Sequence, residues 1–69
     1  MISDEIYNDL FNFISFKEIE LLQEITGFGE DEILSDYVLD CNLKNMTIDF
    51  KTWSNYKNEI EERGKNGEF

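Results

Sequence analysis

The sequence predicts an all-α fold, a compact single domain of four short helices, on three observations. Its 69 residues are enough for one domain. Apolar residues recur at intervals of three and four through most of the chain, which is the spacing of an amphipathic helix. Signals that start and stop helices interrupt this pattern at short intervals. The helical domain is expected to cover residues 1–64, and residues 65–69 are expected to fray as a C-terminal tail.

Capping signals predict the first two helices. Ser3 can cap a helix that carries Asp4 and Glu5 in its first turn, where the helix dipole favours anions. Ser15 and Glu18 form a capping box at the start of a second helix. Helical spacing in the first helix is followed by Ile6, Leu10, Phe13 and Ile14. Ile14 and Ile19 occupy the two positions of a hydrophobic staple at the start of the second helix.

Gly27 is expected to end the second helix, because glycine readily takes the left-handed conformation that follows a helix. Phe28 is expected to fold back onto Leu22 in a Schellman motif. The "GFG" stretch at residues 27–29 is not read as a phosphate-binding loop, since the lysine and hydroxyl of that motif are absent.

The third helix is expected to start near Asp31 and to end near Asn42. Residues 45–50 then give two conflicting signals, because alternating apolar residues suggest a strand whereas Thr47 followed by Asp49 suggests a capped helix. A lone strand would have no partner, so the helix is favoured. The apolar face of the third helix consists of Ile33, Leu34, Tyr37, Val38 and Cys41.

The fourth helix is expected to end near Arg63 and Gly64, with basic residues at the negative end of its dipole. Four helices with short connections pack around one core. The predicted core consists of Phe13, Ile14, Leu22, Ile25, Phe28, Leu34, Tyr37, Val38, Phe50, Trp53 and Ile60.

The charge distribution is uneven. The formal net charge is −10. Residues 1–43 hold eleven acidic side chains and one lysine, whereas residues 44–69 hold five acidic and five basic ones. Such a field attracts basic surfaces and repels nucleic acid and anionic membranes, although it can also serve solubility alone. With one cysteine, no signal peptide at residues 1–15 and no membrane-spanning apolar run, a cytoplasmic location is expected.

The residue types argue against an enzyme. The chain has no histidine, which removes the commonest general base and transition-metal ligand. Cys41 lies on an apolar helix face and is expected to be a buried hydrophobe rather than a nucleophile. No segment matches a calcium-binding loop, and paired carboxylates would need a pocket that raises one pKa. No catalytic, cofactor-binding or metal-binding residue is therefore expected.

Acidic residues are expected to line the outside of the second and third helices. Like charges at i and i+4 destabilise a helix by roughly 0.2–0.5 kcal/mol per pair, so repeated pairs suggest that the negative face has a use. The stripe could stand in for a run of phosphates and occupy a nucleic-acid groove on a basic partner. The predicted partner-binding residues are Glu20, Glu24, Glu30, Asp31, Glu32, Asp36 and Asp40.

"ILSDY" at residues 33–37, followed by Phe50, Trp53 and Tyr56, resembles the YozE-like family of small Firmicute proteins over residues 18–60. The resemblance implies a helical fold similar to SAM domains, and the family has no established activity. The family typically has Phe-Pro before the third helix, whereas Phe28 here precedes a glycine and the chain contains no proline. The aromatic spacing of the fourth helix is also about one residue tighter than in the family.

Three hypotheses for function remain open. The first is a non-enzymatic acidic protein that docks on a basic, nucleic-acid-handling partner and inhibits it, as phage or mobile-element inhibitors of restriction or CRISPR effectors do. The second is a YozE-like protein-interaction module that works through its near-neutral fourth helix, where Lys51 and Lys57 would matter. The third is an immunity protein or antitoxin that neutralises a basic toxin. Direct nucleic-acid or membrane binding is not expected, and the oligomeric state is left open.

Overall fold

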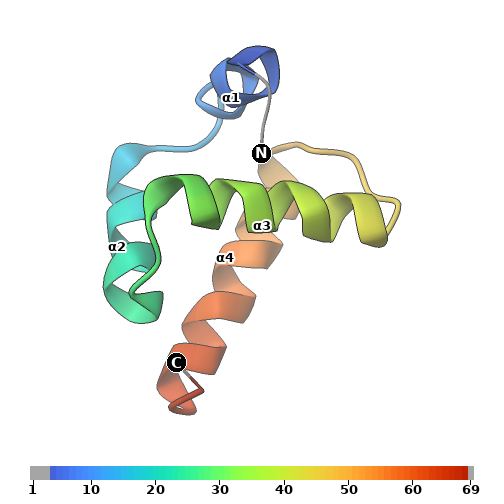
Figure 1. Cartoon of the computed structure of the whole chain (residues 1–69). Helices are drawn as coiled ribbons and strands as arrows, with labels where there is room; N and C mark the ends of the chain where they lie inside the picture. Colours follow the sequence, from blue (N-terminus) through green and yellow to red (C-terminus); the bar gives the residue numbers. More distant parts are fainter. Residues whose placement is uncertain (1–3, 69) are drawn as a thin grey trace.

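The computed structural model describes residues 4–68, which form four helices and no strand. These are α1 (Asp4–Leu10), α2 (Phe16–Thr26), α3 (Glu30–Leu43) and α4 (Phe50–Lys65). In Figure 1, α3 runs across α4, α2 lies to one side of both, and α1 sits above them. The predicted all-α, four-helix fold is confirmed. No helix among the described residues is long and apolar enough to cross a membrane.

The start of α2 follows the predicted capping box. The backbone N–H of Glu18 donates to Ser15 Oγ at 3.3 Å, and the backbone N–H of Ser15 donates to Glu18 Oε1 at 3.1 Å. Ile14 and Ile19, the expected staple positions, are both buried. Local sequence therefore sets the turn between α1 and α2. The predicted Ser3 cap of α1 lies outside the described residues.

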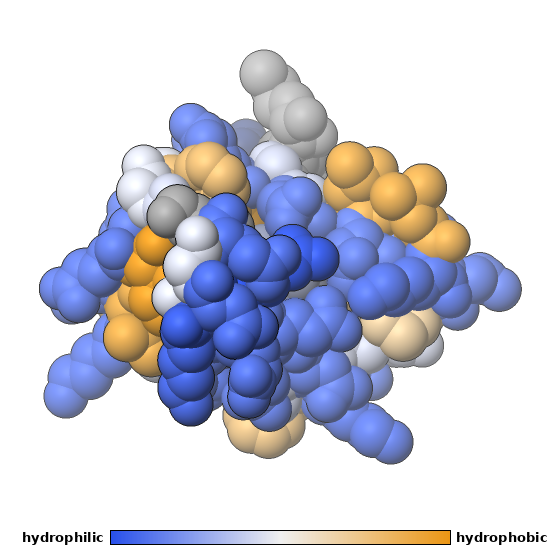
Figure 2. Space-filling view, turned by 90° about the horizontal axis from the view of Figure 1, so that it is seen from below, coloured by the Kyte–Doolittle hydropathy of each residue, from blue (hydrophilic) through white to orange (hydrophobic). Residues whose placement is uncertain are grey.

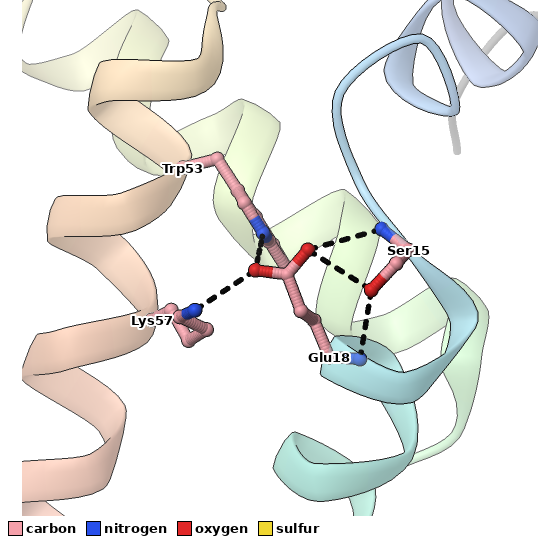
Figure 3. A network of polar contacts seen from close by, with 4 residues as sticks. All are labelled: Ser15, Glu18, Trp53 and Lys57. Carbon is pink, nitrogen blue, oxygen red and sulfur yellow. Dashed lines mark hydrogen bonds and ion pairs between the residues drawn. The ribbon is translucent and has the colours of Figure 1, made fainter.

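Glu18 also joins α2 to α4 (Figure 3). Its Oε2 accepts a hydrogen bond from Trp53 Nε1 at 3.2 Å and pairs with Lys57 Nζ at 2.8 Å. Partial burial acts to raise the pKa of Glu18, but the bonds from Lys57, Ser15 and Trp53 outweigh it and hold the pKa below its ordinary value. One carboxylate thus caps a helix and fixes its packing.

The end of α2 differs in detail from the prediction. Gly27 has a φ of 76°, and its N–H donates to the Gln23 carbonyl at 2.8 Å, which is the single bond of an αL cap. The hydroxyl of Thr26 donates to the Leu22 carbonyl and accepts from the N–H of Phe28. Because Thr26 satisfies both groups, the expected Schellman motif does not form here, and Phe28 is 43% exposed rather than part of the core.

The Schellman motif lies instead at the end of α3. Asn45 has a φ of 54°, its N–H donates to the Asn42 carbonyl at 3.2 Å, and the N–H of Met46 donates to the Cys41 carbonyl at 2.8 Å. Asparagine is the residue other than glycine that most often takes this position. The helix consequently runs one residue beyond Asn42, to Leu43.

Residues 45–48 form neither a strand nor the first turn of a helix. Asp49, not Thr47, caps α4: the Thr52 N–H donates to Asp49 Oδ1 at 2.9 Å, and the Asp49 N–H donates to Thr52 Oγ1 at 3.1 Å. The Thr52 hydroxyl also reaches the Thr47 carbonyl and the buried Tyr37 hydroxyl. The helix therefore starts at the local capping box of Asp49 and Thr52, and the contact with Tyr37 holds Thr52 in place. Burial is the main cause that raises the pKa of Tyr37 to about 12.

The core lies where α2, α3 and α4 meet and is closed from above by α1. The rings of Tyr37, Trp53 and Tyr56 form a cluster with centroids 5.2–5.8 Å apart. The prediction for Phe50 was wrong: it is the first residue of α4 and is 64% exposed. Six predicted core residues are buried, namely Ile14, Leu22, Leu34, Tyr37, Trp53 and Ile60; Phe13, Ile25 and Val38 are partly buried; and Leu10, Ile19, Ile33, Cys41 and Tyr56 complete the core.

The end of α4 lies at Lys65, beyond the predicted Gly64. Gly67, with a φ of 73°, closes the helix: its N–H donates to the Gly64 carbonyl and the Glu68 N–H donates to the Arg63 carbonyl. Fraying of residues 65–69 stays a prediction.

Candidate functional site

The predicted acidic face divides into two groups of side chains. Within residues 4–68, three of the seven predicted carboxylates are bonded to other side chains, and four are not. The bonded ones are Glu30, Asp36 and Asp40, and the others are Glu20, Glu24, Asp31 and Glu32.

The first turn of α3 explains part of the acidic cluster. The helix begins at Glu30, one residue before the predicted Asp31, and its N-cap Gly29 offers no side chain to the free N–H groups. Acidic residues in a first turn stabilise a helix by about 0.3–1 kcal/mol each through the dipole. Glu30 also accepts a hydrogen bond from the Tyr7 hydroxyl at 2.8 Å, and this bond is the main cause that raises the pKa of Tyr7. Glu30 therefore helps to hold α1 against α3.

Asp36 and Asp40 turn toward α4. Residues at i and i+4 are 40° apart around a helix of 3.6 residues per turn, so a stripe that begins at Glu32 drifts around α3. The Tyr56 hydroxyl donates to Asp36 Oδ2 at 2.7 Å. Burial, and then this bond, raise the pKa of Tyr56. Asp40 pairs with Lys44 at 3.3 Å.

Lys44 lies between two helices, since its Nζ is 3.3 Å from Asp40 and 3.7 Å from Glu59 of α4. The hydrogen bond to Asp40, followed by the two carboxylate charges, raises the pKa of Lys44. Asp40 is thus partly neutralised, which makes it a weaker candidate for binding a partner than the sequence suggested.

In the part of the chain that the structure describes, four exposed carboxylates remain without a neutralising partner. Glu20 and Glu24 lie on the outside of α2, and Asp31 and Glu32 lie in the first turn of α3. Within residues 4–68, none of the four makes a side-chain hydrogen bond or an ion pair. We name these four residues the open carboxylates. They are the part of the predicted site that is free to meet a basic partner.

Cys41 lies in the core, as predicted, with 1% of its surface exposed. A thiol at this depth cannot be reached by a substrate from solvent. No group of three or more Cys, Asp and Glu side chains in the part of the chain described here could hold a metal ion. The features of the domain that can contact another molecule are therefore its exposed charges and its exposed apolar side chains.

Sequence analysis missed a groove of about 420 Å³ between α2 and α4. It is lined by Leu21, Ile25, Glu61, Gly64 and Lys65. A glycine inside an otherwise helical pattern was the available signal, because it often marks a close approach of two helices.

A second missed feature is apolar. Leu39 and Leu43 are 55% and 77% exposed on the outer side of α3. Figure 2 shows a mostly hydrophilic surface with separate hydrophobic patches, one of them on the side toward which α3 runs. The sequence signal was the presence of apolar residues on two opposite sides of the C-terminal half of this helix.

No family model, curated protein or solved structure matches this chain. The resemblance to the YozE-like family therefore stays a prediction.

Proposed function

We propose that this domain is a non-enzymatic acidic binding protein, which docks the outer faces of α2 and α3 on a basic partner that handles nucleic acid. The observation that carries the proposal is the set of open carboxylates, Glu20, Glu24, Asp31 and Glu32, which have no neutralising partner among residues 4–68. Glu20 and Glu24 repel each other across one helical turn. Retaining that repulsion on a small domain favours an external use for the charge.

The sign and density of the charge on α2 and α3 favour a partner with a basic surface. A face of fixed carboxylates attracts Lys- and Arg-rich surfaces, and proteins that bind nucleic acid carry such surfaces in their grooves. A domain that occupies this groove would compete with the nucleic acid and inhibit the partner. Binding of this kind weakens as salt rises.

An immunity protein or antitoxin that neutralises a basic toxin would use the same contacts. Identification of the captured protein distinguishes the two hypotheses. A toxin would indicate an immunity protein or antitoxin, and a host or restriction nuclease would indicate an inhibitor. Direct action through α4 has less support, because Lys57 is partly buried and engaged by Glu18, and only Lys51 of the two predicted lysines is exposed.

The test compares two variants of equal net charge. The first replaces the open carboxylates (Glu20→Gln, Glu24→Gln, Asp31→Asn, Glu32→Gln). The control replaces four other exposed acidic residues (Glu5→Gln, Asp9→Asn, Glu62→Gln, Glu68→Gln). Each is used with the parent as bait in host lysate at low and at physiological salt.

We expect the parent and the control to capture a basic, nucleic-acid-binding protein, and the first variant to lose it. Nucleic acid should displace the captured protein from the parent. If circular dichroism shows that both variants are folded and both capture the protein equally, the open carboxylates have no role in binding. Capture that is insensitive to salt and to nucleic acid would contradict the inhibitor mechanism.

A further inference from the structure

Two neighbouring leucines face outward on α3. Leu39 and Leu43 are separated by four residues, so their side chains adjoin along the helix at about 5–6 Å between Cβ atoms. More than half of each is exposed, at 55% and 77%. Together they form an apolar patch on α3, and Figure 2 shows hydrophobic surface on that side of the molecule.

The C-terminal half of α3 is apolar on opposite faces. Cys41 and Val38 pack into or against the core, while Leu39 and Leu43 lie on the other side. An apolar face of a helix is normally covered, so a helix with two opposite apolar faces calls for a neighbour on each. Within residues 4–68, no other element buries these two leucines.

The acidic residues near the apolar patch favour a cationic molecule as the one that binds there. Glu32 and Asp36 are both exposed and precede Leu39 on α3 by seven and three residues, which is close to two turns and one turn, and Asp36 also accepts the hydrogen bond from Tyr56. A second copy of this chain would bring like charges to the interface. Two leucines also supply far less than the roughly 800 Å² per partner of a stable protein interface. A short cationic segment avoids both obstacles.

We propose that the outer face of α3 docks one side of a cationic amphipathic helix belonging to the partner. The apolar residues of that helix cover Leu39 and Leu43, and its Lys or Arg residues meet Glu32 and Asp36. The inference rests on the proposed function, since it takes the partner to be basic, and adds an apolar anchor to it. A few well-packed contacts that lose their water at the centre of an interface carry most of the affinity, whereas surrounding charges mainly speed association and set specificity.

Two synthetic peptides test the inference. One is a helical peptide with Lys on one face and Leu on the other, and the second has the same composition in a shuffled order without an apolar face. Both carry the same charge, so the shuffled peptide reports on the acidic surface alone. We expect the parent to bind the amphipathic peptide roughly tenfold or more tightly than the shuffled one, measured by calorimetry.

The double variant Leu39→Gln, Leu43→Gln should lose this preference and still bind the shuffled peptide. Glutamine is a good helix former, so the exposed positions should tolerate it. Leu21→Gln is the matched control, because Leu21 is also an exposed leucine (42%) but lies on α2. It should keep the preference. If the double variant does not fold, Leu43→Gln alone replaces it.

Amide chemical shifts locate the bound peptide. Shifts centred on residues 32–43 support the inference, and shifts centred on the groove at Leu21 and Ile25 overturn it. Equal binding of both peptides to the parent, or a preference that survives in the leucine variant, also overturns it and leaves the acidic binder standing. Failure of both peptides to bind at low salt overturns the inference together with the electrostatic basis of the proposed function.

Discussion

Gly64 of α4 packs against Ile25 of α2 so closely that a Cβ atom at Gly64 would lie 2.5 Å from Ile25 Cγ2. A separation under 3.0 Å requires something to move. Cγ2 is attached directly to the β carbon of a β-branched residue, so it cannot swing away as the end of a long side chain could. The absence of a side chain at Gly64 therefore sets how near α2 and α4 lie.

The variant Gly64→Ala should be less stable, although alanine normally stabilises a helix interior by about 0.5–1 kcal/mol relative to glycine. Overpacking of a close contact costs about 1–3 kcal/mol, so we expect a net loss of about 1–2 kcal/mol in urea unfolding. In an Ile25→Ala background, which lacks Cγ2, the same change should be neutral or stabilising. An equal loss in both backgrounds would contradict the close-contact explanation.

Acid should remove the contribution of Glu18. Its pKa is lowered from 4.5 in the folded protein, so the unfolded chain binds the proton more readily. The stabilisation is present above that value and is lost as the pH falls through the lower folded pKa. The variant Glu18→Gln should be about 1–2 kcal/mol less stable near pH 7. The difference from the parent should shrink at more acidic pH.

Urea unfolding across this pH range measures the effect. Glu20→Gln is the matched control, because Glu20 lies on the same helix and makes no side-chain hydrogen bond or ion pair within residues 4–68. It should cause no comparable loss near neutral pH. A Glu18→Gln penalty that stays constant down to acidic pH would show that the charge on Glu18 is not the cause.

Asp36 is predicted to have a structural role through Tyr56. The hydroxyl of Tyr56 is part-buried and bonded to Asp36 at 2.7 Å, so Tyr56→Phe should cost about 1 kcal/mol in thermal or urea unfolding. Asp36→Asn should cost less, because an amide oxygen can still accept the bond. Substitution of Asp36 therefore changes stability as well as charge. No loss of stability in Tyr56→Phe would mean that this bond contributes nothing.

Asn45 offers a route to a more stable domain. It holds a φ of 54° at the end of α3, a conformation that costs an ordinary L-residue roughly 1 kcal/mol. Asn45→Gly should therefore raise the free energy of unfolding by about 0.5 kcal/mol, and Asn45→Ala should lower it by about 1 kcal/mol. Opposite signs for the two variants are the expected signature. A destabilised glycine variant would mean that the Asn45 side chain matters more than its backbone.

Sequence was a reliable guide where neighbouring residues decide the outcome. The capping box of Ser15 and Glu18 and the stop at Gly27 depend on groups within a few residues, and the structure has both. The same reasoning misplaced the start of α4. Thr47 and Asp49 are both suitable caps by type. The capping box of Asp49 and Thr52 is also local and was overlooked, and the bond between Thr52 and the buried Tyr37 adds a tertiary contact that favours it.

The candidate site shows the same division. Charge and spacing by themselves determined that α2 and α3 carry an excess of carboxylates. Only the tertiary structure decided that Asp36 meets Tyr56, since that neighbour depends on how α3 crosses α4, whereas the pair of Asp40 and Lys44 is an i, i+4 contact within one stretch of the chain. The role of Gly64 could not be predicted for the same reason. From the sequence alone this glycine indicated the end of a helix, and its contact with Ile25 depends on how α2 packs against α4. Local hydrogen bonds depend on residues a few positions apart and can be predicted from short stretches of sequence. Burial and pairing between helices depend on how residues far apart in the chain pack together.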